Sequence, residues 1–165
     1  MAHSHHHRDA VHVRFAVLTV SDTRRPEDDV GGRRIRELLE GAGHTLVEQR
    51  IVRDERAQIR WALHTARPEV EVLVVTGGTG IAPRDVTFEV VRDVLDKQIS
   101  GFGELFRMLS YEQIGAAAML SRAVAGVARG RLVFALPGSV KGVELAVERL
   151  ILPQVGHMVG LLRGG

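Results

Sequence analysis

The chain has 165 residues, of which 45% are hydrophobic, and this length predicts one domain with one core. Its formal charge of +2 and its aromatic content of 4% argue against a nucleic-acid-binding protein, because neither a basic stripe nor a base-stacking platform is evident. The absence of cysteine excludes a disulfide framework, a thiolate nucleophile and a cysteine-based zinc site, and fits a reducing compartment.

The N-terminus is set apart from the rest of the chain. Four of the first seven residues are histidine, so residues 1–10 are expected to be a disordered or tag-like end, and residues 11–165 a single domain. The later histidines lack the spacing of a helical metal site. The apolar runs are shorter than the ~20 residues of a membrane span. We therefore expect a cytoplasmic protein that binds neither membranes nor nucleic acids.

The first half of the chain alternates strand and helix patterns. The run Val13–Val20 is mostly apolar and β-branched, as expected for a strand buried on both faces of a sheet. Apolar residues then recur at helical spacing and two glycines supply a stop, which predicts a helix over about 30–42. Further strands are predicted over 45–52 and 70–75, with a second helix between them that ends before Pro68.

The second half continues with helices and one pair of strands. Apolar positions at helical spacing predict a helix over about 86–95, and a further helical segment begins at 101–108. Strands are predicted over 124–128 and 131–136, separated by a turn. A last helix is predicted from 139 to about 152, with Pro153 ending its first section.

This order of elements predicts the fold class. Strand–helix alternation is typical of an α/β protein with three layers, in which a mostly parallel sheet is covered by helices on both faces. Such folds bind their ligands at the carboxyl ends of the strands. We therefore expect any functional site at that edge of the sheet.

A glycine-rich loop, Thr76–Gly80, directly follows one of the buried strands. Three glycines in four positions allow consecutive N–H groups to point into one concavity and an anion to approach closely. An ordinary tight turn between strand and helix is the alternative. The Gly-Lys-Ser/Thr of a P-loop is absent, and Pro83 stands where a dinucleotide fingerprint has its third glycine, so both of these sites are disfavoured.

Polar residues follow the other predicted strands. Ser21-Asp22, Asp54 and Pro137-Gly138-Ser139 should lie on the same edge as the glycine loop. Asp54 and Asp85 each precede a helix and could be N-caps, but two carboxylates beside a glycine loop would also suit Mg²⁺.

Ser139 and Arg122 each allow two interpretations. Ser139 should cap the last helix, where it could also bind phosphate. Arg122, after Ser121, could bind phosphate oxygens through its guanidinium or form a surface ion pair. Trp61 is expected to be a packing residue, and Phe102 and Phe106 to belong to the core or to an interface.

Taken together, these residues resemble the MoaB/MogA family of molybdenum cofactor biosynthesis proteins over about residues 14–153. The stretch 106–115, continuing into 121–126, resembles the MoaB branch. The matching segments are Ser21-Asp22, Val52–Glu55, Thr76–Gly80 with Arg84-Asp85, Gly101–Glu104, Ser121–Ala123 and Leu136–Ser139.

The resemblance implies the MogA/MoaB-like molybdopterin-binding fold and the adenylylation of molybdopterin by Mg-ATP. It implies that Asp54 and Asp85 are the catalytic pair, which binds Mg²⁺ and positions ATP. The residues implied to bind ATP or its phosphates are Ser21, Asp22, Thr76, Gly77, Gly78, Thr79, Gly80, Pro137, Gly138 and Ser139. Those implied to bind molybdopterin are Glu104, Ser110, Ser121 and Arg122.

The family also implies a homo-oligomer, either a trimer or a hexamer, for which the apolar region 101–120 is the candidate interface. Two other functions stay open. One is a non-catalytic protein of the same pathway that binds molybdopterin or a nucleotide, and the other is a nucleotide-binding module unrelated to molybdenum.

Overall fold

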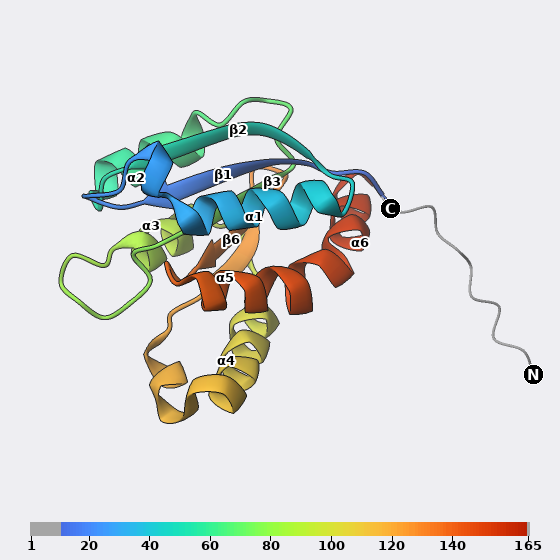
Figure 1. Ribbon diagram of the computed structural model, residues 1–165. Coiled ribbons are helices and arrows are strands. Elements are labelled where there is room, and N and C mark those ends of the chain that lie inside the picture. The colour runs from blue at the N-terminus through green and yellow to red at the C-terminus, as the bar shows by residue number, and fades with distance from the viewer. Residues whose placement is uncertain (1–10, 165) are drawn as a thin grey trace, which may run out of the picture.

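A six-stranded, mostly parallel sheet forms the centre of the molecule (Figure 1). The structure is a computed structural model that describes residues 11–164; the histidine-rich segment 1–10 lies outside the described residues. The strand order is β2-β1-β3-β6-β5-β4. The strands are β1 (Arg14–Val20), β2 (Thr45–Val52), β3 (Val72–Thr76), β4 (Lys97–Gln98), β5 (Val124–Ala128) and β6 (Arg131–Leu136).

Four neighbouring strands, β2, β1, β3 and β6, run parallel, and β5 turns back antiparallel to β6. The turn between β5 and β6 places Arg129 at φ 51° and Gly130 at φ 75°, and positive φ at both central residues suits the twist of a hairpin. The mostly parallel sheet predicted from the sequence is thereby confirmed.

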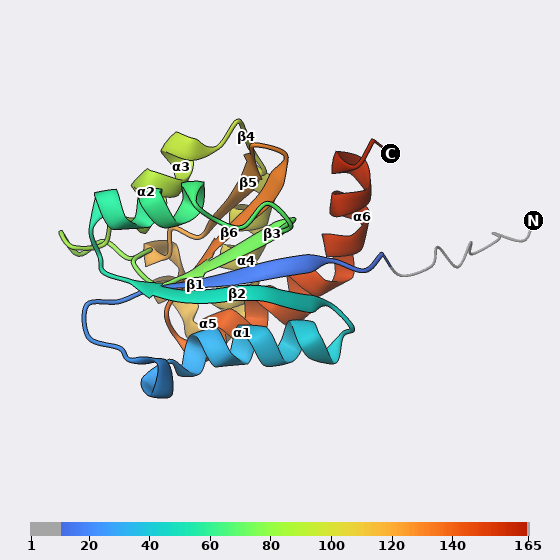
Figure 2. The same cartoon turned by 90° about the horizontal axis from the view of Figure 1, so that it is seen from above.

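Helices cover both faces of the sheet, as Figure 2 shows. α2 and α3 lie on one face, and α1, α4 and the long C-terminal helical segment lie on the other. The helices are α1 (Val30–Gly41), α2 (Arg56–His64), α3 (Thr87–Val94), α4 (Ser100–Ile114), α5 (Val140–Ala146) and α6 (Leu152–Leu162), with short 3₁₀ helices η1 (Pro26–Asp28) and η2 (Gly115–Leu120).

Successive side chains of the central strands point to opposite faces of the sheet, which divides the core into two clusters. In β1, Phe15 and Val17 point to the α1 and α5 side, whereas Ala16 and Leu18 point to the α2 and α3 side. All four are buried, since successive side chains of a strand point to opposite faces. The continuous apolar character of β1 follows from this double burial.

The C-terminal helix differs from the prediction at Pro153. Helical structure continues from Val140 to Leu162 without a break, because the segment η3 (Val147–Ile151) widens to a π-helix just before the proline. Proline lacks an N–H and its ring crowds the preceding turn, so a wider turn accommodates it. By length and composition this helix could cross a membrane, but its face with Val143, Val147 and Ile151 is buried against the sheet.

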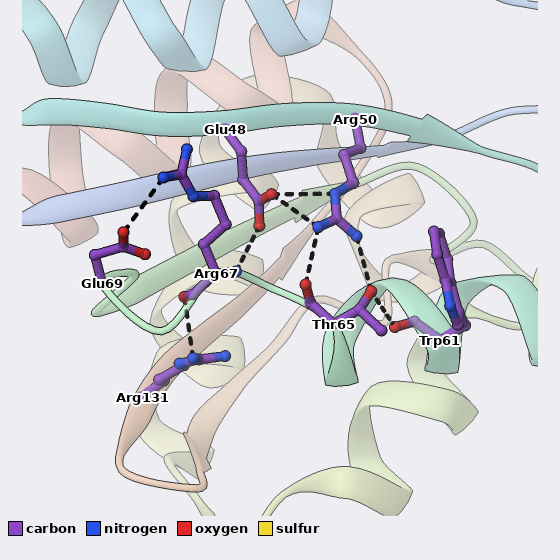
Figure 3. A network of polar contacts seen from close by, with 7 residues as sticks. All are labelled: Glu48, Arg50, Trp61, Thr65, Arg67, Glu69 and Arg131. Atoms are coloured by element: carbon purple, nitrogen blue, oxygen red, sulfur yellow. Dashed lines mark hydrogen bonds and ion pairs between the residues drawn. The ribbon is translucent and has the colours of Figure 1, made fainter.

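The edge strand β2 is tied to α2 and to the loop before β3 by a polar network (Figure 3). Arg50 donates to the Glu48 carboxylate at 2.8 Å and to the Thr65 hydroxyl at 2.8 Å, and it lies 5.4 Å from the centre of the Trp61 ring. Trp61 is 58% exposed. The expectation that Trp61 is a packing residue is therefore wrong, whereas Phe102 and Phe106 are buried in the core as expected.

Candidate functional site

A cavity of about 500 Å³ opens at the carboxyl ends of the parallel strands. Its walls come from the loops after β1, β2, β3 and β6 and from the segment that precedes β5. The lining residues are Val20, Ser21, Thr23, Arg24, Asp54, Gly77, Gly78, Thr79, Gly80, Arg84, Asp85, Leu120, Ser121, Pro137 and Gly138. The sequence predicted this edge, because parallel strands bring their carboxyl ends together.

The glycine loop forms one wall, and its backbone requires glycine. Gly77 has φ +99° and Gly78 has φ +70°, which side chains with a Cβ rarely adopt. A Cβ on Gly77 would lie 2.4 Å from the carbonyl oxygen of Val20, and one on Gly78 would lie 2.3 Å from the hydroxyl of Thr87. The loop therefore packs directly against the end of β1 and the start of α3.

Arg122 holds the other end of this loop. Its Nε and Nη2 donate to the carbonyl oxygen of Gly80 at 3.0 and 2.7 Å, and Nη2 also donates to the carbonyl oxygen of Asp85 at 3.1 Å. The guanidinium pairs with Glu89, and this hydrogen bond lowers the pKa of the Glu89 carboxyl. Of the two alternatives for Arg122, the ion pair is the one that the structure contains.

A carboxylate pair, Asp22 and Asp54, lies beside the loop. The backbone N–H of Asp54 donates to Asp22 Oδ1 at 3.0 Å, which joins the loops after β1 and β2. Nη2 of Arg84 lies 3.2 Å from Asp22 Oδ2 and 3.4 Å from Asp54 Oδ2. Burial, and then the negative charge of Asp22, raise the pKa of the Asp54 carboxyl, while Arg84 opposes this shift.

These two carboxylates fit a magnesium ion. The side chain of Asp54 is 6% exposed, whereas that of Arg84 is 60% exposed, so the guanidinium is a cation at the pair that can move into solvent. Within residues 11–164 no group of three or more His, Asp or Glu side chains is placed to hold a metal. Mg²⁺ usually takes one or two protein carboxylates and completes its shell with water and phosphate oxygens.

Neither predicted catalytic aspartate caps a helix. The N-cap positions of α2 and α3 are Glu55 and Val86, and neither side chain makes a capping bond. Asp85 instead accepts a hydrogen bond from the N–H of Ala82 at 2.9 Å, which closes the end of the glycine loop. The N-cap interpretation of both aspartates is therefore wrong, and the structure pairs Asp54 with Asp22.

Other predicted positions border the cavity. The Thr76 hydroxyl donates to the carbonyl oxygen of Pro137 at 2.8 Å, which joins the ends of β3 and β6. Ser139 caps α5 as predicted, because its Oγ accepts from the N–H of Gly142 at 3.2 Å. The hydroxyl of Ser21 accepts from the N–H of Arg24 at 3.1 Å and shapes the loop after β1.

The structure does not bring every predicted residue to the cavity. Glu104 and Ser110 lie on α4 and are absent from its lining, Glu104 on the surface and Ser110 buried. Four other predicted residues adjoin lining residues without lining the cavity themselves: Asp22, Thr76, Arg122 and Ser139. Ser121 does line it, with an Oγ that is buried and has no hydrogen-bond partner among residues 11–164. Arg24 and Arg84 also line it, and only their position beside Ser21-Asp22 and Asp85 in the sequence could have indicated this.

These features define an α/β protein whose candidate ligand site combines a glycine loop with a carboxylate pair at the carboxyl edge of a mostly parallel sheet. The family described as "Probable molybdopterin binding domain" matches residues 16–157. The chain belongs to this family, which includes the MoaB and MogA proteins.

Relatives and solved structures agree with this assignment. The chain is 51% identical over 150 residues to molybdenum cofactor biosynthesis protein B of Halalkalibacterium halodurans, covering 89% of this chain and 88% of the relative. A crystal structure of a molybdenum cofactor biosynthesis protein B is 46% identical, with a TM-score of 0.92 over 94% of this chain and 99% of the other. The tungsten cofactor synthesizing protein MoaB of Pyrococcus furiosus is 40% identical, with a TM-score of 0.84 over 92% and 98%.

Proposed function

We propose that this protein acts in molybdenum cofactor biosynthesis and transfers the adenylyl group of ATP to molybdopterin. The observation that carries the proposal is the Asp22–Asp54 pair beside the glycine loop: Asp54 lines the cavity at the carboxyl ends of the strands in a molybdopterin-binding family domain, and Asp22 contacts Asp54 from the loop after β1. This combination offers a place for a metal-bound polyphosphate next to a second anionic substrate.

In the proposed reaction, an oxygen of the terminal phosphate of molybdopterin attacks the α-phosphorus of ATP. A new P–O bond forms there, and the bond from the α-phosphorus to the bridging oxygen breaks. Pyrophosphate leaves with the electron pair, and adenylyl-molybdopterin remains. The protein needs no covalent nucleophile, because holding the two phosphates in line and neutralising their charge lowers the barrier.

The residues of the chain divide this work. Asp54 and Asp22 would hold Mg²⁺, which supplies charge neutralisation at the phosphates when it is bound. The N–H groups of Gly77–Gly80 would orient the nucleotide phosphates, with Asp85 and Arg122 keeping the loop in shape. The unpartnered hydroxyl of Ser121 would donate to molybdopterin.

A homo-oligomer accounts for the predicted residues on α4. The side chains of Leu105, Met108, Tyr111 and Ile114 are 47–63% exposed, and α4 lies at the edge of the molecule (Figure 1). An exposed apolar face of this kind marks an interaction site. We propose that copies of this chain pack there, which would place Glu104 near a neighbouring subunit.

One observation favours the non-catalytic alternative. The guanidinium of Arg122 is bound to the carbonyl oxygens of Gly80 and Asp85 and to Glu89, so it is not free for a phosphate in this conformation, and one carboxylate oxygen of Asp85 accepts from the N–H of Ala82. A protein that binds molybdopterin or a nucleotide without turnover would need no more than the loop and the Asp22–Asp54 pair.

The test is pyrophosphate release by the purified protein given molybdopterin and Mg-ATP. Asp54→Asn and Asp85→Asn are measured beside the native chain, with folding checked by thermal melting. Turnover that falls at least about 100-fold in Asp54→Asn supports the proposal, because asparagine is a poorer Mg²⁺ ligand. Ligand binding without turnover in the native chain would establish the non-catalytic alternative.

A further inference from the structure

A second hollow, separate from the cavity described above, lies between α1 and the edge strand β2. It encloses about 710 Å³ and is lined by the loop after β1, by one side of α1 and by residues 49–51 of β2. Figure 2 shows α1 alongside β2, with η1 at the start of the helix. We call this hollow the arginine groove, because its lining includes Arg24, Arg25, Arg33 and Arg36.

Local structure explains why the arginines gather here. Residues 29, 33 and 36 are four and three positions apart, so they share one side of α1. Arg24 and Arg25 reach the same side from the loop that precedes η1. The one acid in the lining is Asp29, which is 1% exposed, and its carboxylate accepts from the Thr19 hydroxyl at 2.6 Å and from the Gly32 N–H at 3.0 Å.

Two of the five arginines that line the groove, Arg36 and Arg50, are paired with carboxylates, and the other three are not paired with any carboxylate in the described part of the chain. Within residues 11–164, the guanidinium groups of Arg24 and Arg25 have no hydrogen-bond or ion-pair partner, and Arg33 donates only to the carbonyl oxygen of Glu27 at 2.9 Å. Arg36 pairs with Glu40 at 3.1 Å. Arg122 shows the contrast, because its guanidinium is saturated by Glu89 and two carbonyl oxygens.

The groove adjoins the candidate active site. Arg24 lines both hollows, so an extended ligand in the cavity at the glycine loop can pass Arg24 and enter the groove. Arginine presents a planar fork of N–H donors that matches two phosphate oxygens at once. A volume of about 710 Å³ exceeds the need of one phosphate and accommodates two linked phosphates with water.

We propose that the arginine groove binds the pyrophosphate portion of a nucleoside triphosphate, with Arg24 at the boundary and Arg25 and Arg33 beyond it. This inference rests on the proposed function in one respect, namely that the reaction in the neighbouring cavity produces pyrophosphate. The groove holds the β- and γ-phosphates before transfer and receives pyrophosphate after the bond to the α-phosphorus has broken.

The test measures binding and needs no turnover. Inorganic pyrophosphate is titrated into the full chain by calorimetry at about 0.15 M salt, where exposed charges more than ~8 Å apart are screened. The double variant Arg25→Ala/Arg33→Ala is compared with the native chain and with Arg149→Ala, a matched control in which an exposed arginine outside the groove is removed. Thermal melting confirms that each variant folds.

We expect the Kd for pyrophosphate to rise at least about tenfold in the double variant and to stay unchanged in Arg149→Ala. AMP, which has only the α-phosphate, should bind both forms equally. Equal pyrophosphate affinity in all three proteins would overturn the proposal, as would an equal loss of AMP affinity in the double variant. So would arginine-dependent binding of poly-glutamate without binding of pyrophosphate, which would assign the groove to an acidic protein partner.

The two proposals fail separately. If pyrophosphate binding depends on Arg25 and Arg33 but the protein does not adenylylate molybdopterin, the groove proposal stands and the proposed reaction is refuted. If the protein adenylylates molybdopterin, and the double variant has the native KM for ATP and the native affinity for pyrophosphate, the proposed reaction stands and the groove proposal is refuted.

Discussion

Replacing Gly77 by alanine tests the glycine loop most directly, because two costs act at that position. With φ at +99°, an alanine there is strained by about 1–3 kcal/mol. Its Cβ would also lie 2.4 Å from the carbonyl oxygen of Val20, a backbone atom that cannot rotate away. Forcing extra volume into a packed site costs about 1–3 kcal/mol more. We therefore expect Gly77→Ala to lose roughly 2–6 kcal/mol of unfolding free energy.

Two other glycines separate these costs. Gly43 has φ +91° with nothing within 4 Å of its added Cβ, so Gly43→Ala should lose about 1–2 kcal/mol from strain alone. Gly41 lies at the end of α1 with open space around it, so Gly41→Ala should gain about 0.5–1 kcal/mol. At about 2–4 °C per kcal/mol in a chain of this size, the three melting temperatures are readily resolved.

The assay is urea unfolding followed by circular dichroism, with ATP affinity measured on the folded variants. The reasoning requires Gly77→Ala to be less stable than Gly43→Ala by at least about 1 kcal/mol. It also requires ATP affinity to fall in the first variant and to stay unchanged in the second. Equal destabilisation of the two would refute the close contact between the loop and Val20.

Three further predictions concern other parts of the molecule. Burial and the charge of Asp22 raise the folded-state pKa of Asp54, so the native chain loses stability as the pH rises through that pKa. Asp54→Asn should therefore be more stable than the native chain near pH 7. This difference in unfolding free energy should vanish in acid, below the ordinary carboxyl pKa. Arg122→Lys removes the fork that binds Gly80 and should cost about 1–3 kcal/mol in denaturant unfolding, with weaker ATP binding. Ile151 is fully buried, so Ile151→Ala should lose about 2–5 kcal/mol without changing the Kd for ATP.

Each of these has a result that contradicts it. For Asp54→Asn, a variant that is less stable than the native chain near pH 7, by a difference that shrinks on acidification, would mean that the carboxylate is stabilised in the folded state. For Arg122→Lys, native ATP affinity would show that the glycine loop keeps its shape without the fork. For Ile151→Ala, a loss below ~1 kcal/mol would show that the helix packs loosely on the sheet.

Much of the fold could be predicted from local patterns. The strands at 45–52, 124–128 and 131–136 were predicted with the bounds that the structure has, because β-branched runs and a turn mark their ends. β4 was missed, since Lys97-Gln98 is polar and becomes a strand only through pairing with Gly126 and Val127. That pairing depends on tertiary contacts, which local sequence does not encode.

In the candidate site, too, some features could be predicted from the sequence and others depend on tertiary contacts. The edge of the sheet where it lies followed from strand order alone, so Ser21, Asp54 and the glycine loop were expected together. The partners of each side chain did not follow. Arg122 reaches Gly80 across 42 positions of sequence, and Asp54 is joined to Asp22 across 32, and such contacts are fixed by how distant loops meet. The predicted roles of these residues in binding and catalysis stay predictions.

The π-helical segment before Pro153 is reflected in the spacing of buried residues along the sequence. Five buried residues of the C-terminal helical segment, Val143, Val147, Ile151, Val155 and Val159, recur every four positions, and Leu145 and Ala146 are also buried near its start. In a regular α-helix a step of four overshoots one turn by about 40°, and four such steps would carry the apolar side about 160° round the axis. The wider turn at 147–151 takes up roughly one extra residue, or about 100°, and so keeps both ends of the helix facing the sheet. A strict interval of four, sustained over several turns, is thus a mark by which such a wide turn can be sought in a sequence.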